Sequence, residues 1–399
     1  MTVPSETPAQ VRVKSLVPLA VVSVLIGTST ALSLPFMSLF LTSDLGAQPF
    51  ALGTFLFVSP VAGLVASALI GRLSDSRAVR RNILGFGGVA GAVGFGVFAV
   101  VREYWVLLVI ASTLGAVATS LMPQMFAYAR QSMERSGSSR APLLISGLRT
   151  LISVAWVTGP PLAALLVSVG GFRGLFGATA FCYAAVAVMA FRLPELGDQQ
   201  RVAVQPERQK PSGMSRQILF AVPAFVLAQG AVVLSASAMP LFVTADLHGE
   251  PGDAGLIMGL CAALEIPLMM WFGALAVRVD QFRLVCGGMA AALAYHAVVV
   301  VASSAWQVAV AQVLQAVVVS AVMGVGITYF QSLEPDRPGY TTTLFTNTTT
   351  AGAMVSGPLL GLAQGLGYRS AYVMSWIMAL LGLLLLLLSN WRKGGANAD

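Results

Sequence analysis

The sequence predicts an all-α integral membrane protein, with twelve transmembrane helices arranged as two six-helix bundles that are related by a parallel pseudo-two-fold repeat. Three observations lead to this prediction: the apolar composition, the length of the apolar segments, and a motif that occurs twice. Hydrophobic residues make up 57% of the chain and charged residues only 10%, with a mean hydropathy of +0.81. Because a water-soluble domain exposes more charge than this, we expect the chain to lie in a membrane.

Twelve apolar segments are long enough to cross a bilayer as helices, because about 20 residues at about 1.5 Å each cover roughly 30 Å of hydrocarbon. They lie at about 16–41, 51–71, 83–101, 105–129, 143–169, 174–193, 218–243, 254–275, 284–302, 306–329, 341–366 and 371–390. The first is too long for the apolar region of a cleavable signal peptide, so we expect it to remain as a spanning helix.

One motif occurs in both halves of the chain. LFLTSDLGAQPFALG (39–53) returns as LFVTADLHGEPGDAG (241–255), 202 positions later. Further pairs keep nearly the same offset: Trp105 and Trp306, Gly159-Pro160 and Gly357-Pro358, and Phe172-Arg173 and Tyr368-Arg369. Both copies enter the membrane in the same direction, which is typical of a parallel repeat. We therefore predict an N-terminal bundle at 1–193, a cytoplasmic linker at 194–217 and a C-terminal bundle at 218–399.

The basic residues are distributed unevenly between the two sides of the predicted membrane. Nineteen Arg and Lys residues fall on the side of the termini, three fall on the other side (Arg102, Arg173 and Arg369), and Arg149 lies within a span. The positive-inside rule then places both termini in the cytoplasm, as in a bacterial inner-membrane protein. This topology accounts for the net charge of +7, so no nucleic-acid partner is expected.

The loop after the second span has a recognisable motif. GRLSDSRAVRR (71–81) resembles the signature loop of the major facilitator superfamily: Gly71, Leu73, Asp75, Arg80 and Arg81 match, whereas Ala78 stands where a glycine is usual. The segment WVTGPP (156–161) resembles the Gly-Pro motif of antiporter branches, although the glycine pair that usually follows is missing. LPFMSLFLT, MPQMFAYAR and LRTLISVAWVTGPPLA look like the bacterial sugar efflux transporters of this superfamily.

The resemblance implies a secondary active transporter that works by alternating access, with proton-coupled export of sugars or sugar-like glycosides as the expected activity. Gly71 is predicted to permit close helix approach, and Asp75 to pair with Arg80 or Arg81 and latch one conformation. Gly159 and Pro160 are predicted to take part in the same conformational latch. The alternative for the loop is an ordinary basic segment that serves topology alone.

Apart from Arg192 at the end of the sixth span, only two charged residues lie within the predicted spans. Glu265 lies near the middle of the eighth span, two residues before Pro267, and Arg149 lies near the start of the fifth. Charge within hydrocarbon costs about 2.5 to 3.5 kcal/mol at mid-helix, so both residues are predicted to couple proton and solute movement. The alternatives are a structural hydrogen bond for Glu265 and an interfacial, snorkelling position for Arg149.

Polar uncharged residues are predicted to line a central solute site. In the superfamily's arrangement, helices 1, 4, 7 and 10 line the cavity and helices 2, 5, 8 and 11 flank it. The candidates for solute binding are Gln124, Trp156, Gln229, Gln312, Gln315 and Asn347, together with Arg149 and Glu265. Carboxamides beside aromatic rings suit a neutral polyhydroxylated solute, although such residues also bond helices to one another in lipid.

The sequence predicts no enzyme, no cofactor and no metal site. No phosphate-binding loop or nucleophile motif occurs, and Cys182, Cys261 and Cys286 lack metal-ligand spacing, so we interpret the cysteines as packing residues. His296, on an outer helix, is predicted to bond a neighbouring helix. The expected partners are a small solute, protons and membrane lipid, with a monomer as the functional unit. The rival is a multidrug antiporter, in which Met122, Met125, Met269, Met270 and Trp271 would form an adaptable apolar pocket, and a non-transporting receptor is a third possibility.

Overall fold

The computed structural model describes residues 17–76, 79–135, 141–194 and 215–390, and within these ranges all regular elements are helical. The first half contains α1 (Val17–Ser33), α2 (Met37–Leu39), η2 (Phe40–Asp44), α3 (Pro49–Ser76), α4 (Arg80–Val100), α5 (Tyr104–Ile110), η3 (Ala111–Gly115), α6 (Ala116–Thr119), α7 (Leu121–Arg135) and α8 (Ala141–Phe191). The second half contains α9 (Arg216–Leu241), η4 (Phe242–Asp246), α10 (Pro251–Leu275), α11 (Gln281–Val301), α12 (Ala305–Val319), η5 (Ser320–Val325), α13 (Gly326–Leu333), α14 (Pro338–Leu366) and α15 (Arg369–Asn390). The η segments are π-helical turns.

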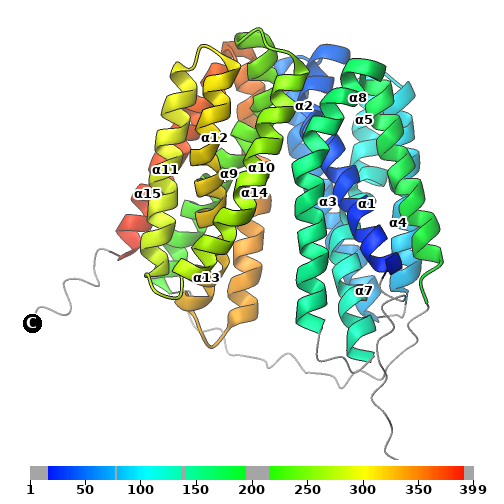
Figure 1. The fold of residues 1–399 in the computed structure, drawn as a ribbon, viewed down its shortest axis with the longest axis horizontal. Coiled ribbons are helices and arrows are strands. Elements are labelled where there is room, and N and C mark those ends of the chain that lie inside the picture. Colours follow the sequence, from blue (N-terminus) through cyan, green and yellow to red (C-terminus); the bar gives the residue numbers. More distant parts are fainter. Residues whose placement is uncertain (1–16, 77–78, 136–140, 195–214, 391–399) are drawn as a thin grey trace, which may run out of the picture.

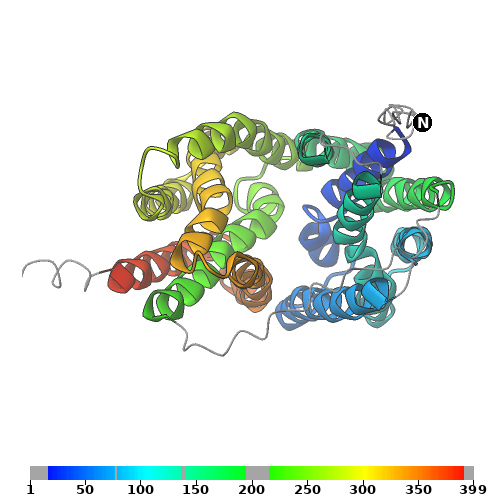
Figure 2. The ribbon, with the colours of Figure 1, turned by 90° about the horizontal axis from the view of Figure 1, so that it is seen from below.

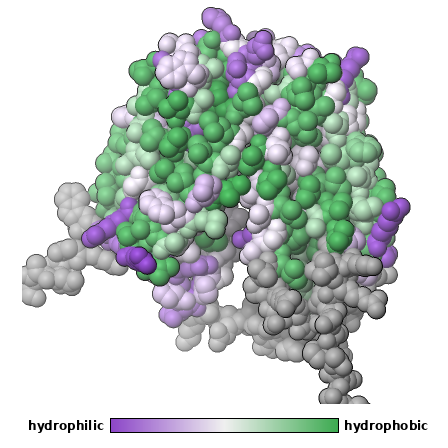
Figure 3. Space-filling model, in the orientation of Figure 1, coloured by the Kyte–Doolittle hydropathy of each residue, from purple (hydrophilic) through white to green (hydrophobic). Residues whose placement is uncertain are grey.

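Helices α1–α8 and α9–α15 form two groups that stand side by side (Figures 1 and 2). We call the end that carries the Asp44 and Asp246 turns, at the top of Figure 1, the upper end, and the opposite end the lower end. Apolar side chains cover the flanks while hydrophilic ones gather toward the two ends (Figure 3), as a bilayer requires. The predicted linker lies almost wholly outside the described residues, so the boundaries of the two bundles stay a prediction.

Ten segments of the described chain are long and apolar enough to span a membrane. One of them, Leu144–Phe191, contains a reversal of chain direction at Gly171, where φ is 61° and ψ is −166°. Residues other than glycine rarely adopt this conformation. The 29-residue helix α14 is not among the ten, since its first half is rich in threonine. The all-α membrane fold is therefore confirmed, whereas the count of twelve spans stays a prediction.

The repeated motif encodes the same turn in both halves. Each copy ends its helix in a π-turn, η2 or η4, in which the N–H of Leu45 donates to Phe40 O at 3.2 Å and that of Leu247 to Phe242 O at 3.1 Å. The next residue has a positive φ in both copies, 63° at Gly46 and 53° at His248. A proline then begins α3 or α10, where its missing N–H removes no helical bond.

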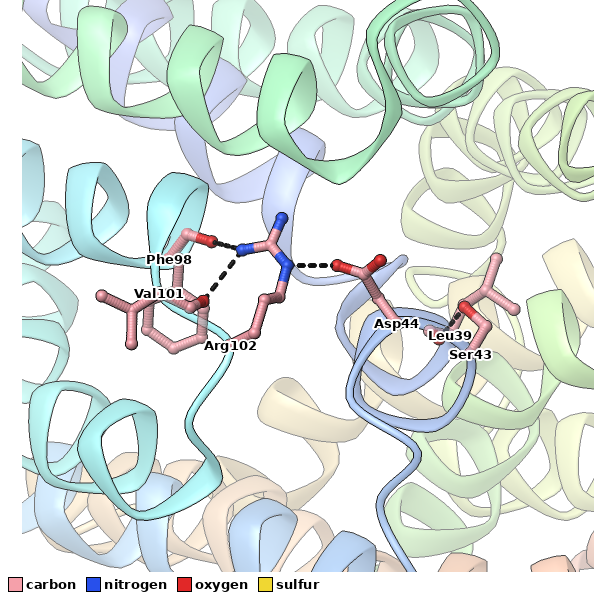
Figure 4. A network of polar contacts seen from close by, with 6 residues as sticks. All are labelled: Leu39, Ser43, Asp44, Phe98, Val101 and Arg102. Carbon is pink, nitrogen blue, oxygen red and sulfur yellow. Dashed lines mark hydrogen bonds and ion pairs between the residues drawn. The ribbon is translucent and has the colours of Figure 1, made fainter.

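An arginine closes each of these turns. In the first half Arg102 Nε lies 2.5 Å from Asp44 Oδ2, and Nη1 donates to the carbonyls of Phe98 and Val101 at 2.8 Å each (Figure 4). In the second half the backbone N–H of Arg369 donates to Asp246 Oδ2 at 2.9 Å. Its guanidinium donates to the carbonyls of Val300 and Ala302. Both guanidinium groups lie 5.3 Å from a phenylalanine ring, that of Phe40 or of Phe242.

Three apolar cores hold the helices together. The largest lies toward the upper end and contains residues of both halves, among them Phe40, Phe176, Phe242 and Tyr372. The other two lie toward the lower end, and each belongs to one half alone, with 19–193 supplying one and 221–386 the other. Among the described residues, the halves therefore share a core only toward the upper end.

Candidate functional site between the two halves

Two glycine-lined seams join the halves at the upper end. In the first, α10 crosses α8, and a methyl group added at Gly255 would lie 2.7 Å from Pro160 O, while one at Gly259 would lie 2.9 Å from Val157 O. In the second, α14 crosses α3, and a methyl group added at Gly361 would clash with Pro49 O. Backbones approach this closely only where a side chain is absent, so the glycines allow the upper end to close.

Two side-chain hydrogen bonds also cross between the halves at this end. Ser38 Oγ donates to Ser237 O at 2.6 Å, and Gln364 Nε2 donates to Ala47 O at 2.7 Å. Since both involve residues near the upper turns, they would have to break before the halves could separate there. The sequence did not lead us to predict Gly255, Gly259 or Gln364 as contact residues. The place of Gly255 in the repeated motif was the signal that could have identified it.

Glu265 lies below the first seam, on α10. Its side chain is half-buried, and Cys261 Sγ, one turn earlier, donates to Oε1 at 3.3 Å. Pro267 has no N–H to donate to Ala263 O, so that carbonyl lacks its helical partner. Glu265 forms no ion pair with an arginine or lysine of the described ranges.

Arg149 lies at a similar depth on α8 but is exposed. Its guanidinium is 5.6 Å from the ring of Phe126 on α7. From the Val157–Gly259 contact, Arg149 lies eight residues down α8, about 12 Å, and Glu265 six residues down α10, about 9 Å. The two charges thus come to the same level of the membrane from opposite halves, without forming an ion pair in this structure.

The four predicted glutamines are all buried, but they differ in bonding. Gln229 Nε2 donates to Thr348 Oγ1 at 2.7 Å and its Oε1 accepts from Thr349, which ties α9 to α14. Gln312 Nε2 donates to Tyr295 Oη at 3.4 Å and Val308 O at 3.2 Å. Gln124 and Gln315 are 6% and 5% exposed, and no donor within the described chain bonds the Oε1 of either. The carbonyl oxygens of Gln124 and Gln315 are therefore buried and unpartnered in the described structure.

The structure places the remaining predicted residues as follows. Trp156 is half-buried on α8 and Asn347 is exposed on α14. Gly159 packs against Ala31 of α1, and the carbonyl of Pro160 belongs to the first seam. The Gly-Pro segment thus contacts its own half through one residue and the other half through the next.

The loop predicted to be a latch is described only in part. Arg80 Nη1 donates to Gln131 Oε1 at 2.9 Å, and Arg81 Nε to Asn82 Oδ1 at 3.4 Å. The side chain of Asp75 lies outside the described residues, so its pairing is not tested. The close helix approach predicted at Gly71 is wrong for this structure, because a methyl group there would meet no atom within 4 Å.

The prediction for His296 is also wrong. Its ring is fully buried against Tyr295 and Tyr372, with centroids 5.0 and 6.4 Å away, and neither ring nitrogen has a hydrogen-bond partner in the part of the chain that the structure describes. Aromatic packing holds this side chain in place. In the same ranges no three His, Cys, Asp or Glu side chains come together as metal ligands.

Comparison with known proteins decides the family. The sequence model of the family described as the Major Facilitator Superfamily matches residues 19–295 and 221–397. The chain belongs to the major facilitator superfamily. It is 32% identical over 360 residues to sugar efflux transporter B of Salmonella typhimurium, covering 90% of this chain and 91% of that protein. It is 30% identical over 370 residues to sugar efflux transporter A of Escherichia coli, covering 92% and 93%.

Solved structures of the superfamily share the fold. A mutant form of the nucleoside transporter NupG superposes with a TM-score of 0.81 at 12% identity, covering 94% of this chain and 99% of that one. A bacterial homologue of the lysosomal transporter Spinster, in an inward-facing and occupied conformation, gives a TM-score of 0.77 at 12% identity, covering 97% and 98%. At such identities the likeness establishes the fold alone. This superfamily member is a multi-pass membrane transporter.

Proposed function

We propose that this transporter exports sugars or sugar-like glycosides across a bacterial inner membrane in exchange for protons. The observation that carries the proposal is the asymmetry of contact: glycine seams and a shared core join the halves at the upper end, and separate cores serve them at the lower end. A rocking of the halves about a site between them would alternate access. The names of the relatives supply the solute class and the direction.

The orientation follows from the basic residues. The described arginines toward the lower end are Arg72, Arg80, Arg81, Arg130, Arg192, Arg216, Arg278, Arg283 and Arg337, whereas Arg102, Arg173 and Arg369 lie at the upper end. The positive-inside rule favours a cytoplasmic lower end and cytoplasmic termini. The described conformation would then be open to the cytoplasm, from which an exporter loads its solute.

The unpartnered carbonyl oxygens of Gln124 and Gln315 support a neutral, hydroxyl-bearing solute. One comes from each half, so a bound sugar would bridge α7 and α12 while Trp156 offers a ring to an apolar sugar face. Gln229, Gln312 and Asn347 remain second candidates for binding the solute. In this conformation Gln229 and Gln312 are hydrogen-bonded within the protein, and Asn347 is exposed. The described methionines give a multidrug pocket little support: Met125 is buried in a core while Met270 is 74% exposed.

A thermal-shift screen separates these substrate classes. Lactose or a thiogalactoside should raise the unfolding temperature of the purified transporter, and a lipophilic cation should not. Stabilisation by the cation alone would support the multidrug alternative.

Glu265 is the proposed proton carrier, with Arg149 on the opposite wall favouring release of the proton when the halves rock. Charge on a half-buried carboxyl is disfavoured while its surroundings are dry and favoured once water or a guanidinium approaches. In proteoliposomes, Glu265→Gln should retain solute binding and downhill exchange and lose pH-driven accumulation. Flux equal to wild type after a pH jump would remove Glu265 from the coupling mechanism.

Arg149 has a matched test in the same assay. Arg149→Lys keeps the charge but loses the planar guanidinium that stacks on Phe126. We expect it to impair transport already, and Arg149→Ala to impair it further. Wild-type solute affinity and flux in both variants would show that Arg149 serves only the membrane interface.

A further inference from the structure

A second polar residue lies in the same layer as Glu265. A methyl group added at Gly324 would lie 3.6 Å from Met269 Cε, so η5 faces α10 at this level. Both helices run from the upper to the lower end, and Glu265 and Ser320 each lie four residues before these contacting positions. Residues four apart share a helical face, so Glu265 and Ser320 are brought to one layer between α10 and the π-turn.

The repeat places the same two positions together in the first half. Gly63 precedes Glu265 by 202 positions and Thr119 precedes Ser320 by 201, the offset that relates Trp105 to Trp306. A methyl group added at Gly63 would lie 3.0 Å from Thr119 Oγ1. The two offsets differ by one residue, which is what a π-turn adds, so the Gly63–Thr119 contact corresponds to Glu265 and Ser320. This layer therefore pairs a glycine with a hydroxyl group in the first half, and a carboxyl group with a hydroxyl group in the second.

The Ser320 hydroxyl has no other use in the described structure. The residue is 0% exposed, and its Oγ has no hydrogen-bond partner within the described chain. Most buried serines here bond a backbone carbonyl one turn back, as Ser235 does to Val232 O at 3.0 Å. A buried hydroxyl without a partner is unfavourable, and a hydroxyl can both donate and accept, so Ser320 suits a neighbour whose protonation changes.

Few other groups face Glu265. On α10 itself, Cys261 donates its weak S–H to Oε1 and leaves Oε2 for a second partner. The elements packed against α10 are α8, α9, α12, η4 and η5. Neither α12 nor η5 contains a titratable residue. At this level α8 brings Arg149, while Arg216 of α9 lies at the lower end and Asp246 of η4 is bonded at the upper end.

We propose that Ser320 is the positioning residue for the coupling proton, as the reversible hydrogen-bond partner of Glu265. With the carboxyl protonated, its O–H donates to Ser320 Oγ. When the proton leaves to water between the halves, the serine rotates and donates its own O–H to the carboxylate. Ser320 keeps its proton throughout. This inference rests on the proposed proton coupling, and it extends the ion site from one residue to a layer that spans two helices.

The transport test compares Ser320→Ala with Ser320→Thr, which restores the hydroxyl, and with Ser235→Ala, which removes an equally buried serine of the same half. A hydrogen bond to the charged carboxylate is the stronger of the two, so its loss disfavours release of the proton. The midpoint of the pH profile of flux in Ser320→Ala should therefore move upward by about one pH unit. Ser320→Thr and Ser235→Ala should keep the wild-type midpoint. A wild-type profile in Ser320→Ala, with exchange intact, would overturn the assignment.

A second measurement is independent of transport. Infrared difference spectra of the purified protein across a pH titration identify the C=O stretch of protonated Glu265 as the band that Glu265→Gln abolishes. In Ser320→Ala this band should move to the higher frequency of a carboxyl with one fewer hydrogen bond, and in Ser320→Thr it should return. An unmoved band would overturn the role of Ser320. Absence of pH-driven flux in the wild type, with the band shifted as expected, would instead overturn only the proposed antiport.

Discussion

The two halves close their upper turns with the same receiving site but with arginines from different places in the chain. Each site consists of a phenylalanine ring, an aspartate four residues later, and carbonyls at the end of a neighbouring helix. Arg102 reaches the first site from the α4–α5 connection, whereas Arg369 reaches the second from the start of α15. The counterpart of Arg102 in the second half is Ser303, and that of Arg369 in the first half is Arg173, which is exposed.

This difference shows which part of the repeat carries the constraint. The phenylalanine and the aspartate of each receiving site lie within the repeated motif, and its carbonyls lie at the end of α4 or α11. The site is kept because carbonyls at a helix end need a donor. The donor has only to be a long cationic side chain within reach of the site. An arginine in the α4–α5 connection and an arginine at the start of α15 therefore serve equally well. The halves also differ in their seams: Gln364 adds a hydrogen bond to the α3–α14 seam, and the matching position in the α8–α10 seam is Leu166.

The largest effects are expected at the glycine seams. Gly255→Ala and Gly361→Ala insert a methyl group where backbone from the other half already lies, and overpacking of this kind costs about 1–3 kcal/mol. Both should lower the unfolding temperature and shift the transporter away from the conformation closed at the upper end. Gly252→Ala, on the same helix with no atom within 4 Å, is the control and should be neutral or stabilising. Equal behaviour of Gly252→Ala and Gly255→Ala would contradict the seam.

A smaller and unequal effect is expected at the arginines. Arg369→Ala leaves the second site without any cation, so we expect a loss of about 1–2 kcal/mol in unfolding free energy, in line with hydrogen bonds from a charged donor. Arg102→Ala should cost less, because Arg173 lies at the position from which Arg369 acts. Double-mutant analysis checks this: Arg102→Ala with Arg173→Ala should exceed the sum of the single changes. Strict additivity would show that Arg173 cannot reach the site.

The smallest effects are expected at the residues with positive φ. Gly46→Ala places a side chain in the left-handed region at a cost of about 1 kcal/mol, although there is open space around it. His248→Gly relieves the same strain in the other half, so it should be neutral or slightly stabilising. Thermal unfolding of the two variants should shift in opposite directions. A shift of the same sign in both would mean that the two turns are not equivalent.

Local features of the sequence were sufficient for much of this architecture. Apolar length predicted the membrane helices, because the bilayer sets how many apolar residues a span needs, and the repeat predicted two related halves. The aspartate that occurs in both copies of the motif, Asp44 and Asp246, marked equivalent turns. Hydrogen bonds between residues a few positions apart stabilise these turns. Glu265 and Arg149 stood out because charge in hydrocarbon is costly wherever it occurs.

Contacts between distant segments decided the rest, because they depend on which helices pack together and at what depth. Only the tertiary structure separates Gln229, bonded between two helices, from Gln124 and Gln315, whose carbonyl oxygens have no donor among the described residues. It likewise shows that Gly255 lies in a tight seam while Gly71 faces open space, although both residues are glycine. The side chain at each position follows from the sequence, but the atoms that surround it are set by how the two halves meet.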